Sequence, residues 1–578
     1  MINIKENESL NTLNHSCAHL MAHAVKKLYP DALFWVGPVI SDGFYYDIDL
    51  VDITITEDDL PVIEKTMKKI AKSNKLIKRI ELTKEEALTM FKDDPYKLDL
   101  INDMEDELIT AYKQDDFIDL CTGPHVETTK ACKHFKLIKV SGAYYKGDIN
   151  NKMLQRIYGI CFETAEELEE YLYQLEEAKK RDHRKIGKDL DLFCFSDLVG
   201  PGLPLFTPKG TIIIDELQKR VEAICKDYGF EKVITPHLAN IKLFEMSGHA
   251  TKFADELFHV TSAKEHNMVI KPVQCPHQTQ IYASKLRSYR DLPIRYMESA
   301  KQYRAELPGG ISGLSRVYAI TCEDGHSFCT VDQVKQEVIN MVNIIKDFYT
   351  GLGLWDNCWV SLSVKDPNKP ENYIGEPKDW DTCETLLAEV SDELELNAVR
   401  CEGEAALYGP KLDFMFKDAL GREIQIPTVQ LDFATAKRFD LTYIDPDGNK
   451  VNPVIVHRAI LGSYERFMML LIEHFAGALP SWLAPVQVNI IPVNNEFHLD
   501  YATGVKETLK KHNIRVELDD RNEKLGYKMR ESITRKIPYT IIIGNNEIEN
   551  NNISYRLYGS DDTTSIELSE FINLITEE

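Results

Sequence analysis

The sequence predicts a multidomain protein that combines α+β and α/β domains. At 578 residues the chain exceeds what one hydrophobic core organises, and roughly three or four domains are expected. The first part of the chain mixes helical and strand-like runs, whereas the last part alternates strands and helices in a βαβ rhythm. We therefore expect an N-terminal α+β domain, a central mixed domain and a C-terminal α/β domain.

The composition is typical of a globular protein in a reducing compartment. Hydrophobic residues make up 43% of the chain, and none of its 12 cysteines forms a CxxC pair. No apolar run is long enough for a membrane helix and no export signal is visible, so we expect a cytoplasmic protein without a membrane partner. The net charge of −24 argues against nonspecific nucleic-acid binding, but it allows a local basic face. Two runs are candidates for such a face, with an ordinary solvated surface as the alternative: residues 181–185 (Arg-Asp-His-Arg-Lys), and Lys528, Arg530, Arg535 and Lys536.

The N-terminal segment carries two pairs of chemically active side chains. A helical pattern begins the chain and places His15 and His19 four residues apart, on one face. Strand-like runs follow at 43–48 and 135–140, and between them Cys121 and His125 flank the turn-forming Gly123-Pro124. The two pairs suggest either a zinc site or a metal-free hydrolytic site, and the alternative is a set of separate core histidines.

A Glu-rich segment separates this region from the rest. Thr164 and Glu167 give it a capping-box start, and it is predicted to form a connecting helix. We divide the chain into a domain at 1–162, a linker helix at 163–182, a domain at 183–482 and a domain at 483–578.

The central domain has no Gly-rich phosphate loop. Neither GxxxxGK[ST] nor a GxGxxG after a strand occurs, so a nucleotide would have to be held in another way. Arg304, Arg316 and Arg466 are candidates, because a guanidinium group matches a phosphate geometrically. The helix predicted at 211–227 places Leu217, Val221 and Ile224 on one stripe.

The C-terminal domain of about a hundred residues is predicted to hold a largely parallel sheet. Its strand-like runs lie at 486–491, 514–518 and 539–544, with helical segments between them. The Asn-rich run at 545–552 is predicted to be a loop.

The motifs of the central domain resemble a known family. Arg304-Ala305-Glu306 and the run 462–466 (Gly-Ser-Tyr-Glu-Arg) are similar to motifs 2 and 3 of the class II aminoacyl-tRNA synthetases, and the helix at 211–227 before Thr235-Pro236 is similar to motif 1. The runs at 271–276, 323–326, 408–411, 428–433 and 456–462 resemble the bacterial-type threonyl-tRNA synthetases in order and spacing. The resemblance covers essentially the whole chain. It implies an antiparallel-sheet catalytic domain between an N-terminal editing domain and a C-terminal anticodon-binding domain.

The resemblance also implies the reaction and its site. The family uses ATP with Mg²⁺ to activate L-threonine, transfers it to tRNA(Thr) and acts as a homodimer. Carried over, Cys275, His326 and His457 become ligands of one zinc ion per chain, Arg304 contacts the α-phosphate, Glu306 the adenine and Arg466 the γ-phosphate. Arg316 supports the phosphates, and His249 lies near the terminal ribose of the tRNA. The remaining substrate-binding positions implied are Asp324, Tyr408, Lys411, Gln425, Thr428, Gln430 and Ser463.

A second, hydrolytic site follows from the chemistry of such a zinc site. Three protein ligands leave positions open for the amino and hydroxyl groups of threonine, and valine lacks the hydroxyl. Serine has both groups and lacks one methyl, which provides only about 1–3 kcal/mol of discrimination. The resemblance assigns the removal of serine to His15, His19, Cys121 and His125, with Lys97 and Asp119, in a pocket too tight for the methyl group of threonine. The threonyl-type site works without metal, although the related alanyl-type domains hold zinc.

The C-terminal residues matching the anticodon-reading positions of the family are Asn522, Glu547 and Arg556. Reading exposed bases by side-chain hydrogen bonds is the usual strategy for single-stranded RNA. Without the resemblance, each of them would be interpreted as an ordinary surface residue.

The sequence also departs from the family pattern. The editing signature begins by residue 14, so the small ubiquitin-like domain that usually precedes it is expected to be absent. Around the synthetic pocket, Asn-Cys-Pro-Gly-His is replaced by the run 274–278 (Gln-Cys-Pro-His-Gln), Arg-Gly-Phe-Thr-Gln by the run 318–322 (Tyr-Ala-Ile-Thr-Cys), and a Gly or Ser by Pro427. Either neutral drift or a second copy remodelled to resist an inhibitor explains these changes. The competing functions are a non-charging paralogue that binds tRNA or regulatory RNA, and a stand-alone hydrolase of mischarged tRNA.

Overall fold

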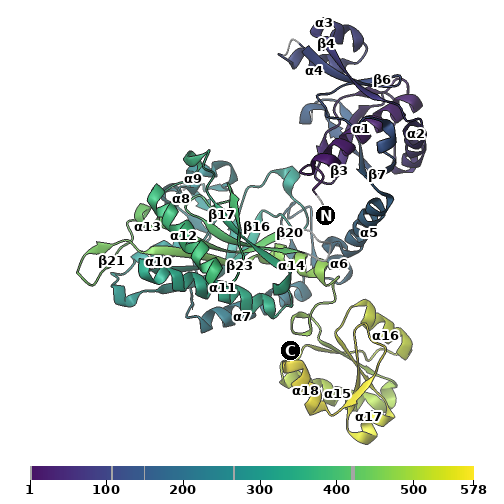
Figure 1. Cartoon of the computed structure of the whole chain (residues 1–578). Helices are drawn as coiled ribbons and strands as arrows, with labels where there is room; N and C mark the ends of the chain where they lie inside the picture. Colours follow the sequence, from purple (N-terminus) through teal and green to yellow (C-terminus); the bar gives the residue numbers. More distant parts are fainter. Residues whose placement is uncertain (1–2, 106–107, 149, 264–266, 418–422, 578) are drawn as a thin grey trace. The chain divides into compact units, whose positions relative to one another are not determined.

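The computed structural model describes residues 3–105, 108–148, 150–263, 267–417 and 423–577. The chain forms two compact units, Met1–Glu177 and Ala178–Glu578 (Figure 1). The division falls inside helix α5 (Ala165–Arg181), the predicted connecting helix. Thr164 and Glu167 form the expected capping box at its start, with the Thr164 hydroxyl and N–H both donating to the Glu167 carboxylate. Within the described ranges, no helix has the length and apolar character that crossing a membrane requires.

The first unit is an α+β fold with two sheets, as predicted. A five-stranded sheet has the order β1-β3-β8-β7 with β2 beside β3, and a three-stranded antiparallel sheet has the order β4-β5-β6. Its helices and strands, in chain order, are α1 Glu8–Leu28, β1 Leu33–Phe34, β2 Val39–Ile40, β3 Gly43–Asp49, α2 Leu60–Lys72, β4 Ile77–Thr83, α3 Lys84–Met90, α4 Pro95–Asp103, β5 Leu108–Gln114, β6 Phe117–Leu120, β7 His134–Tyr144 and β8 Met153–Phe162.

Helix α1 is the central element of this unit. Asn7 caps its N-terminus by accepting from the Leu10 N–H, and Lys26 and Lys27 lie in its last turn, where they complement the helix dipole. Its apolar residues, including Leu13, Leu20 and Val25, are buried against strands β3 and β8. The side chains of His15 and His19 therefore have a fixed position relative to the sheets.

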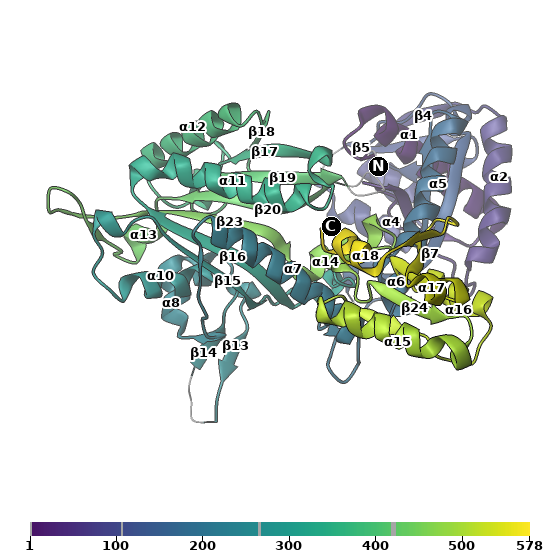
Figure 2. The ribbon, with the colours of Figure 1, turned by 90° about the horizontal axis from the view of Figure 1, so that it is seen from below.

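The second unit is built on a large sheet with the order β11-β15-β16-β23-β20-β19-β17-β18. The six inner strands are antiparallel, and β11 and β18 join the two edges in parallel. Helices α7, α11 and α12 lie along one face of this sheet (Figure 2), and their apolar residues form its main core. Leu217 and Val221 of α7 are fully buried there, as the predicted stripe requires. The antiparallel central sheet is thus confirmed.

The elements of the second unit that precede its C-terminal segment are, in chain order, α6 His183–Asp189, β9 Phe193–Cys194, β10 Leu205–Phe206, α7 Pro208–Asp227, β11 Glu231–Lys232, β12 Leu238–Ala239, α8 Ile241–Ser247, α9 His249–Lys252, β13 His259–Thr261, β14 Asn267–Ile270, α10 Cys275–Ala283, β15 Ile294–Tyr303, β16 Ala319–Cys329, α11 Val334–Thr350, β17 Cys358–Val364, α12 Pro377–Glu393, β18 Val399–Glu402, β19 Lys411–Lys417, β20 Glu423–Asp432, α13 Thr435–Arg438, β21 Tyr443–Ile444, β22 Lys450–Val451, β23 Val454–Ser463 and α14 Tyr464–His474.

The C-terminal segment has its own five-stranded sheet, in the order β25-β24-β26-β27-β28. Only the first three of these strands are parallel, because β27 and β28 add to the edge as antiparallel strands, so the prediction of a largely parallel sheet is only half right. The elements are β24 Val488–Pro492, α15 Asn495–Lys511, β25 Val516–Leu518, α16 Leu525–Thr534, β26 Tyr539–Ile543, α17 Asn545–Asn550, β27 Ile553–Leu557, β28 Thr564–Ile566 and α18 Leu568–Glu577.

The Asn-rich run at 545–552 is not the predicted loop, because its first six residues form helix α17. Glu547 accepts a hydrogen bond from the Gly544 N–H at 2.7 Å and so caps the N-terminus of the helix. Asn551 ends it in the left-handed conformation, with φ of 50°. Asparagine is a poor helix former but a good terminator, and the cap at each end outweighs the low propensity of the short interior.

Candidate functional site

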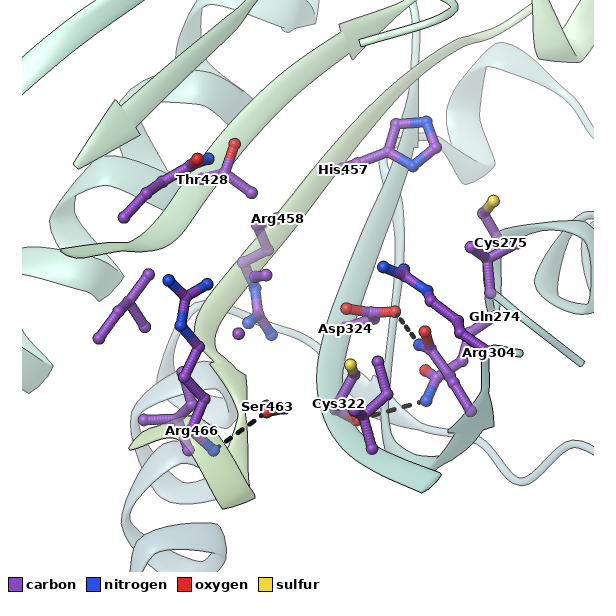
Figure 3. A pocket seen from close by; sticks show the side chains of 18 of the residues that line it. Gln274, Cys275, Arg304, Cys322, Asp324, Thr428, His457, Arg458, Ser463 and Arg466 are labelled. Carbon is purple, nitrogen blue, oxygen red and sulfur yellow. Dashed lines mark hydrogen bonds between the residues drawn. The ribbon is translucent and has the colours of Figure 1, made fainter. Parts of the chain in front are cut away.

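A cavity of about 720 Å³ opens onto the central sheet. It is lined from strands β16, β20 and β23, from the residues that follow β15, and from the first residue of α10. Figure 3 shows Arg304, Asp324, His457 and Arg466 around this space. Most of the predicted synthetic-site residues meet here. The predicted positions that line the cavity are His249, Cys275, Arg304, Glu306, Arg316, Asp324, His326, Tyr408, Gln425, Thr428, Gln430, His457, Ser463 and Arg466.

Three possible metal ligands lie on its wall. Cys275 begins α10, while His326 on β16 and His457 on β23 are direct partners across the antiparallel ladder. One ligand atom from each lies within 4.8 Å of the others. This distance suits a single bound cation, since a zinc ion binds sulfur at about 2.3 Å and nitrogen at about 2.0–2.1 Å.

The two histidines are held from behind by oxygen atoms. His326 Nδ1 lies 2.8 Å from Gln278 Oε1, and His457 Nε2 lies 3.0 Å from Asp432 Oδ2. Each of these bonds leaves the other ring nitrogen with its lone pair, the arrangement that metal-binding histidines use. Burial and the neighbouring His457 lower the pKa of His326 well below its usual range, which favours the neutral imidazole that a metal requires.

The phosphate-binding candidates differ in their present partners. In the described part of the chain, neither Arg304 nor Arg466 forms an ion pair, although both line the cavity. Arg466 lies in the first turn of α14, where the Ser463 hydroxyl accepts from its backbone N–H at 3.2 Å. Arg316 instead pairs with Glu306 at 2.6 Å, so the predicted adenine-reading carboxylate is bound to the predicted phosphate-supporting cation.

Asp324 and Tyr408 are each held by an amide side chain. The Gln302 amide donates to Asp324 at 2.6 Å, and the Tyr408 hydroxyl donates to Gln430 at 2.5 Å. Burial and the adjacent Glu323 raise the pKa of Asp324 to about 6. The Tyr408 ring also stacks on His457, with centroids 4.7 Å apart. These contacts hold Asp324 and Tyr408 in place beside the three possible metal ligands.

Gln425 and Lys411 meet at a shared carboxylate. The Gln425 amide donates to Asp413 Oδ1 at 2.6 Å, and the Lys411 ammonium lies 2.6 Å from Oδ2 of the same residue. Lys411 does not line the cavity described above. Among the predicted binding positions of the central domain, it is the one that the structure leaves outside.

Three of the residues that depart from the family pattern also lie at the cavity. Gln274, Ile320 and Cys322 line it, and Gln274 donates to the carbonyl oxygens of Ala300 and Cys322 at 3.2 and 3.3 Å. His277, in contrast, is buried, with neither ring nitrogen bonded to another part of the described chain.

The N-terminal unit brings its two predicted pairs together. His15 Nε2 and His125 Nε2 each lie 3.1 Å from Cys121 Sγ, and one ligand atom from each of the four residues, His19 included, lies within 4.8 Å of the others. The predicted single site is confirmed as a spatial cluster. The alternative of separate core histidines is wrong.

Hydrogen bonds fix the tautomer of His125. The Ser16 hydroxyl donates to the Thr12 carbonyl at 2.8 Å, so its oxygen accepts from His125 Nδ1 at 3.0 Å. The His125 Nε2 lone pair then faces Cys121. Burial, together with His19 and His15, lowers the pKa of His125 to about 2, and burial raises the pKa of Cys121 to about 12. At neutral pH the cluster holds neutral imidazoles beside a protonated thiol.

Lys97 and Asp119 lie beside the cluster as a buried ion pair. The Lys97 ammonium on α4 is 2.5 Å from Asp119 Oδ1 and also donates to the Trp35 carbonyl at 2.9 Å. The Tyr46 hydroxyl donates to the other oxygen of Asp119, and His19 Nδ1 lies 3.8 Å from it. The charge of the carboxylate is thus balanced by the Lys97 ammonium, and the Tyr46 hydroxyl adds a hydrogen bond to it.

The three predicted anticodon residues lie in different parts of the C-terminal segment. Asn522 and Glu547 follow the ends of β25 and β26, which run parallel to the same strand, whereas Arg556 faces Thr540 near the start of β26. Glu547 also caps α17 and accepts from the Ser554 hydroxyl at 2.6 Å. Arg556 is half-buried and donates to the Thr563 hydroxyl at 2.8 Å.

In both candidate basic faces, several of the charged side chains are bonded to other groups of the fold. Lys528 is buried and donates to the Asp519 carbonyl, Arg535 pairs with Glu517, and the Lys536 ammonium donates to the Ala476 carbonyl. In the run 181–185 His183 is buried, and Arg184 pairs with Asp182 at 2.5 Å. Most of these charges are used within the fold.

Sequence reasoning missed the residues that hold the predicted ligands in place. Asp432, Gln278, Ser16 and Tyr46 lie within or next to motifs of the sequence, but their roles depend on contacts between distant segments. Arg458 was also missed, and it is a buried partner of Glu323 at 2.7 Å beside His457. A charged residue inside an otherwise apolar strand was the available signal.

Comparison with known proteins matches three regions of the chain to families. Residues 258–475 match the tRNA synthetase class II core domain (G, H, P, S and T), and residues 487–578 match the anticodon binding domain. Residues 109–158 match the threonyl and alanyl tRNA synthetase second additional domain. Together with the antiparallel sheet and its cavity, these matches define a class II aminoacyl-tRNA synthetase.

Full-length relatives identify the member of that class. The chain is 46% identical over 581 residues to the threonine–tRNA ligase of Oceanobacillus iheyensis, covering 100% of this chain and 90% of the relative. It is 48% identical over 573 residues to the threonine–tRNA ligase of Staphylococcus carnosus, covering 99% and 88%. The chain belongs to the threonine–tRNA ligase family.

Solved structures agree with this assignment. The RNA binding domain of threonyl-tRNA synthetase from Cryptosporidium parvum superposes with a TM-score of 0.65 at 30% identity, covering 68% of this chain and 98% of that structure. A putative threonyl-tRNA synthetase from Aeropyrum pernix gives a TM-score of 0.61 at 25% identity, covering 69% and 97%.

Proposed function

We propose that this chain joins L-threonine to tRNA(Thr) in two steps at the central cavity. The threonine carboxylate attacks the α-phosphorus of ATP, and pyrophosphate leaves. The terminal hydroxyl of the tRNA then attacks the carbonyl carbon of the threonyl-adenylate, and AMP leaves with the electron pair of the broken bond. The observation that carries this proposal is the meeting of three metal ligands with Arg304 and Arg466 in one cavity.

Arg304 and Arg466 bind the two ends of the triphosphate. The Arg304 guanidinium neutralises the charge that develops on the α-phosphate, and Arg466 holds the γ-phosphate through a fork of N–H donors. Glu306 accepts from the adenine amino group. Because Glu306 is now paired with Arg316 at 2.6 Å, nucleotide binding exchanges that ion pair for contacts to adenine and phosphate. Mg²⁺ accompanies the ATP.

The donor set of Cys275, His326 and His457 fits a zinc ion. Two imidazoles and one thiolate are ligands that zinc prefers, and the oxygens of Gln278 and Asp432 orient both rings. When bound, one zinc ion per chain supplies open positions for the amino and hydroxyl groups of threonine, which valine cannot fill. Asp324, Tyr408, Gln425, Thr428 and Gln430 then position the amino acid and the terminal adenosine. Lys411 acts through Asp413, the carboxylate that it shares with Gln425.

The N-terminal cluster hydrolyses seryl-tRNA(Thr) without a metal ion. A neutral imidazole of the cluster accepts a proton from water as the water attacks the ester carbonyl. The ester bond then breaks, serine is released, and the terminal hydroxyl of the tRNA leaves with a proton. Lys97, paired with Asp119, holds the amino acid end of the substrate. Serine must be removed here because one methyl group provides too little discrimination at the synthetic site.

The remaining parts serve tRNA recognition and assembly. Asn522, Glu547 and Arg556 read anticodon bases, and His249 contacts the terminal ribose. We also infer a cytoplasmic homodimer, with domains at 1–162, 183–482 and 483–578 around the linker helix at 163–182.

Threonine-dependent ATP/pyrophosphate exchange tests this proposal. Threonine and serine should support exchange, whereas valine should not. Absence of exchange with threonine would refute the charging function and would favour a binding paralogue that does not charge tRNA. Neither that paralogue, nor a stand-alone hydrolase, nor an inhibitor-resistant second copy has support from the similar proteins.

A further inference from the structure

His183 lies at a junction between the two phosphate-binding elements of the central cavity. It is the first residue of α6 and is 5% exposed. The turn at residues 312–316, which carries Arg316, packs on one side of its ring. Helix α14, which carries Arg466, packs on the other.

Both ring nitrogens of His183 are used. Nδ1 lies 2.7 Å from Glu473 Oε1, so the proton resides there, on the nitrogen that faces the carboxylate. Nε2 then keeps its lone pair and accepts from the backbone N–H of Leu314 at 3.1 Å. Since Leu314 is fully buried, its backbone N–H cannot bond to solvent, and the imidazole supplies the acceptor that it needs.

The partner carboxylate belongs to the helix of the second arginine. Glu473 follows Arg466 on α14 by about two helical turns. Arg181 strengthens this end of the helix by donating to the Glu473 and His474 carbonyls at 3.4 and 2.9 Å, where a cation also complements the helix dipole. The C-terminal end of α14 is therefore bonded both to the last residue of α5 and to the first residue of α6.

The turn fits closely against the histidine. Gly313 has φ of 47°, and a Cβ atom placed on it would lie 2.3 Å from His183 Nε2. The same turn is closed by mutual hydrogen bonds between the backbones of Ser312 and Arg316. A displacement of Leu314 would therefore move Arg316 as well.

We propose that His183 is a positioning residue for ATP: its imidazole braces the turn of Arg316 against the helix of Arg466, so that both guanidinium groups meet one triphosphate. This inference rests on the proposed function of the cavity. It assigns the buried histidine of the run 181–185 to nucleotide binding rather than to a basic surface.

A pair of matched variants tests the brace. His183→Asn keeps an N–H toward Glu473, but its amide is too short to reach Leu314. His183→Gln can place an oxygen near the former Nε2 position. We expect the Asn variant to raise the KM for ATP on the order of tenfold in the exchange assay, because a buried N–H loses its acceptor. The KM for threonine should stay near the parental value, and the Gln variant should recover most of the ATP effect.

Two further variants separate positioning from a general structural role. Gly313→Ala leaves His183 intact but pushes the turn away from it, so this variant should also raise the KM for ATP. If His183→Asn fails to fold, the KM for ATP of Gly313→Ala tests the proposal instead. In a double-mutant cycle, His183→Asn should add little to the effect of Arg316→Ala, since both act through the same guanidinium.

The outcomes distinguish the brace from the proposed function. A parental enzyme that shows no threonine-dependent exchange refutes the function itself. If the parent is active and folded His183→Asn keeps the parental KM for ATP, or raises the KM values of ATP and threonine equally, the brace is refuted. Full additivity with Arg316→Ala would also overturn it.

Discussion

The N-terminal cluster and the central cluster use the same kinds of side chain but differ in number and support. The central cluster offers Cys275, His326 and His457, whereas the N-terminal cluster offers one cysteine and three histidines. Three protein ligands leave a zinc ion open to substrate, with room to expand beyond four-coordination, whereas four protein ligands complete a closed tetrahedral site. Only the central cluster could therefore hold a metal and bind a substrate to it at the same time.

The oxygen atoms near the imidazoles also have different partners in the two clusters. In the central cluster, the nitrogens of His326 and His457 opposite the metal position are bonded to Gln278 and Asp432. In the N-terminal cluster, the Asp119 carboxylate is paired with Lys97 at 2.5 Å and lies 3.8 Å from His19. An oxygen atom also orients a ring in the N-terminal cluster, where Ser16 Oγ lies 3.0 Å from His125 Nδ1. The two donor sets therefore differ mainly in whether a metal bound to them would keep a position open for substrate.

The largest expected effect separates the two clusters by activity. Cys275→Ala should reduce threonine-dependent exchange below detection, because the amino acid loses its anchoring site, while hydrolysis of seryl-tRNA persists. Exchange and deacylation assays on the same preparation measure this. Loss of both activities in a folded variant would contradict the independence of the clusters.

The reverse experiment changes the N-terminal cluster. Replacing His15 and His19 together with alanine should slow seryl-tRNA hydrolysis by about 10²–10⁴-fold, the usual contribution of general base catalysis, and leave threonine charging intact. Seryl-tRNA should then accumulate in charging reactions with serine. A double variant that deacylates at the parental rate would show that hydrolysis takes place elsewhere.

The supporting hydrogen bonds can be compared in a third experiment. Asp432→Asn weakens the acceptor behind His457 and should lower zinc affinity by about 10–100-fold, as loss of such partners typically does. Chelator competition measures this affinity. The matched variant Ser16→Ala removes the partner of His125 and should slow editing without changing the metal content.

A pH experiment tests whether the N-terminal imidazoles are held neutral. Burial lowers the pKa of His19 well below 6.5, whereas the unfolded imidazole titrates near 6.5. Above that pH neither state binds the proton, but below it the unfolded state gains a proton that the folded state does not, so stability falls as the pH decreases. We expect a loss of about 1 kcal/mol for this residue between pH 6.5 and 5.5.

Hydrogen exchange of the α1 peptides measures this loss, after correction for the pH dependence of the intrinsic rate. The His19→Gln variant is the control, and its protection should depend less on pH. Equal pH dependence in the parent and the variant would mean that His19 is charged in the folded protein.

The smallest effect concerns the remodelled pocket. Ile320 lines the cavity where an aromatic ring is expected to face adenine. Stacking of a base on an aromatic side chain contributes about 1–3 kcal/mol, so Ile320→Phe should lower the KM for ATP several-fold. An unchanged KM for ATP, and an unchanged response of Ile320→Phe with Cys322→Gln to inhibitors of the synthetic site, would favour drift over resistance.

The sequence was sufficient to identify the cysteine and histidine side chains of the two clusters, but not the residues that hold them in place. His15 and His19 could be placed on one helix face from their spacing, and the family motifs identified Cys275, His326 and His457. Asp432 behind His457, and the bond from Leu314 to His183, depend on strand register and loop packing between residues far apart in the chain. No local pattern encodes such contacts.

The errors of prediction have physical causes of the same kind. The helix at 545–550 forms because Glu547 caps it, although its composition favours a loop. The edge strands β27 and β28 are antiparallel because the connections into them, residues 544–552 and 558–563, are shorter than the crossover of about a dozen residues that a parallel strand needs. Side chains of the basic runs are bonded to carbonyl and carboxylate groups that come near them only in the folded chain.

Zinc stoichiometry tests the difference between the two clusters most directly. Elemental analysis of the purified parent should give about one zinc ion per chain, and the metal should be lost in Cys275→Ala and retained in Cys121→Ala. Two zinc ions per chain, or loss of zinc in Cys121→Ala with retention in Cys275→Ala, would contradict the assignment of the metal to the three-ligand cluster.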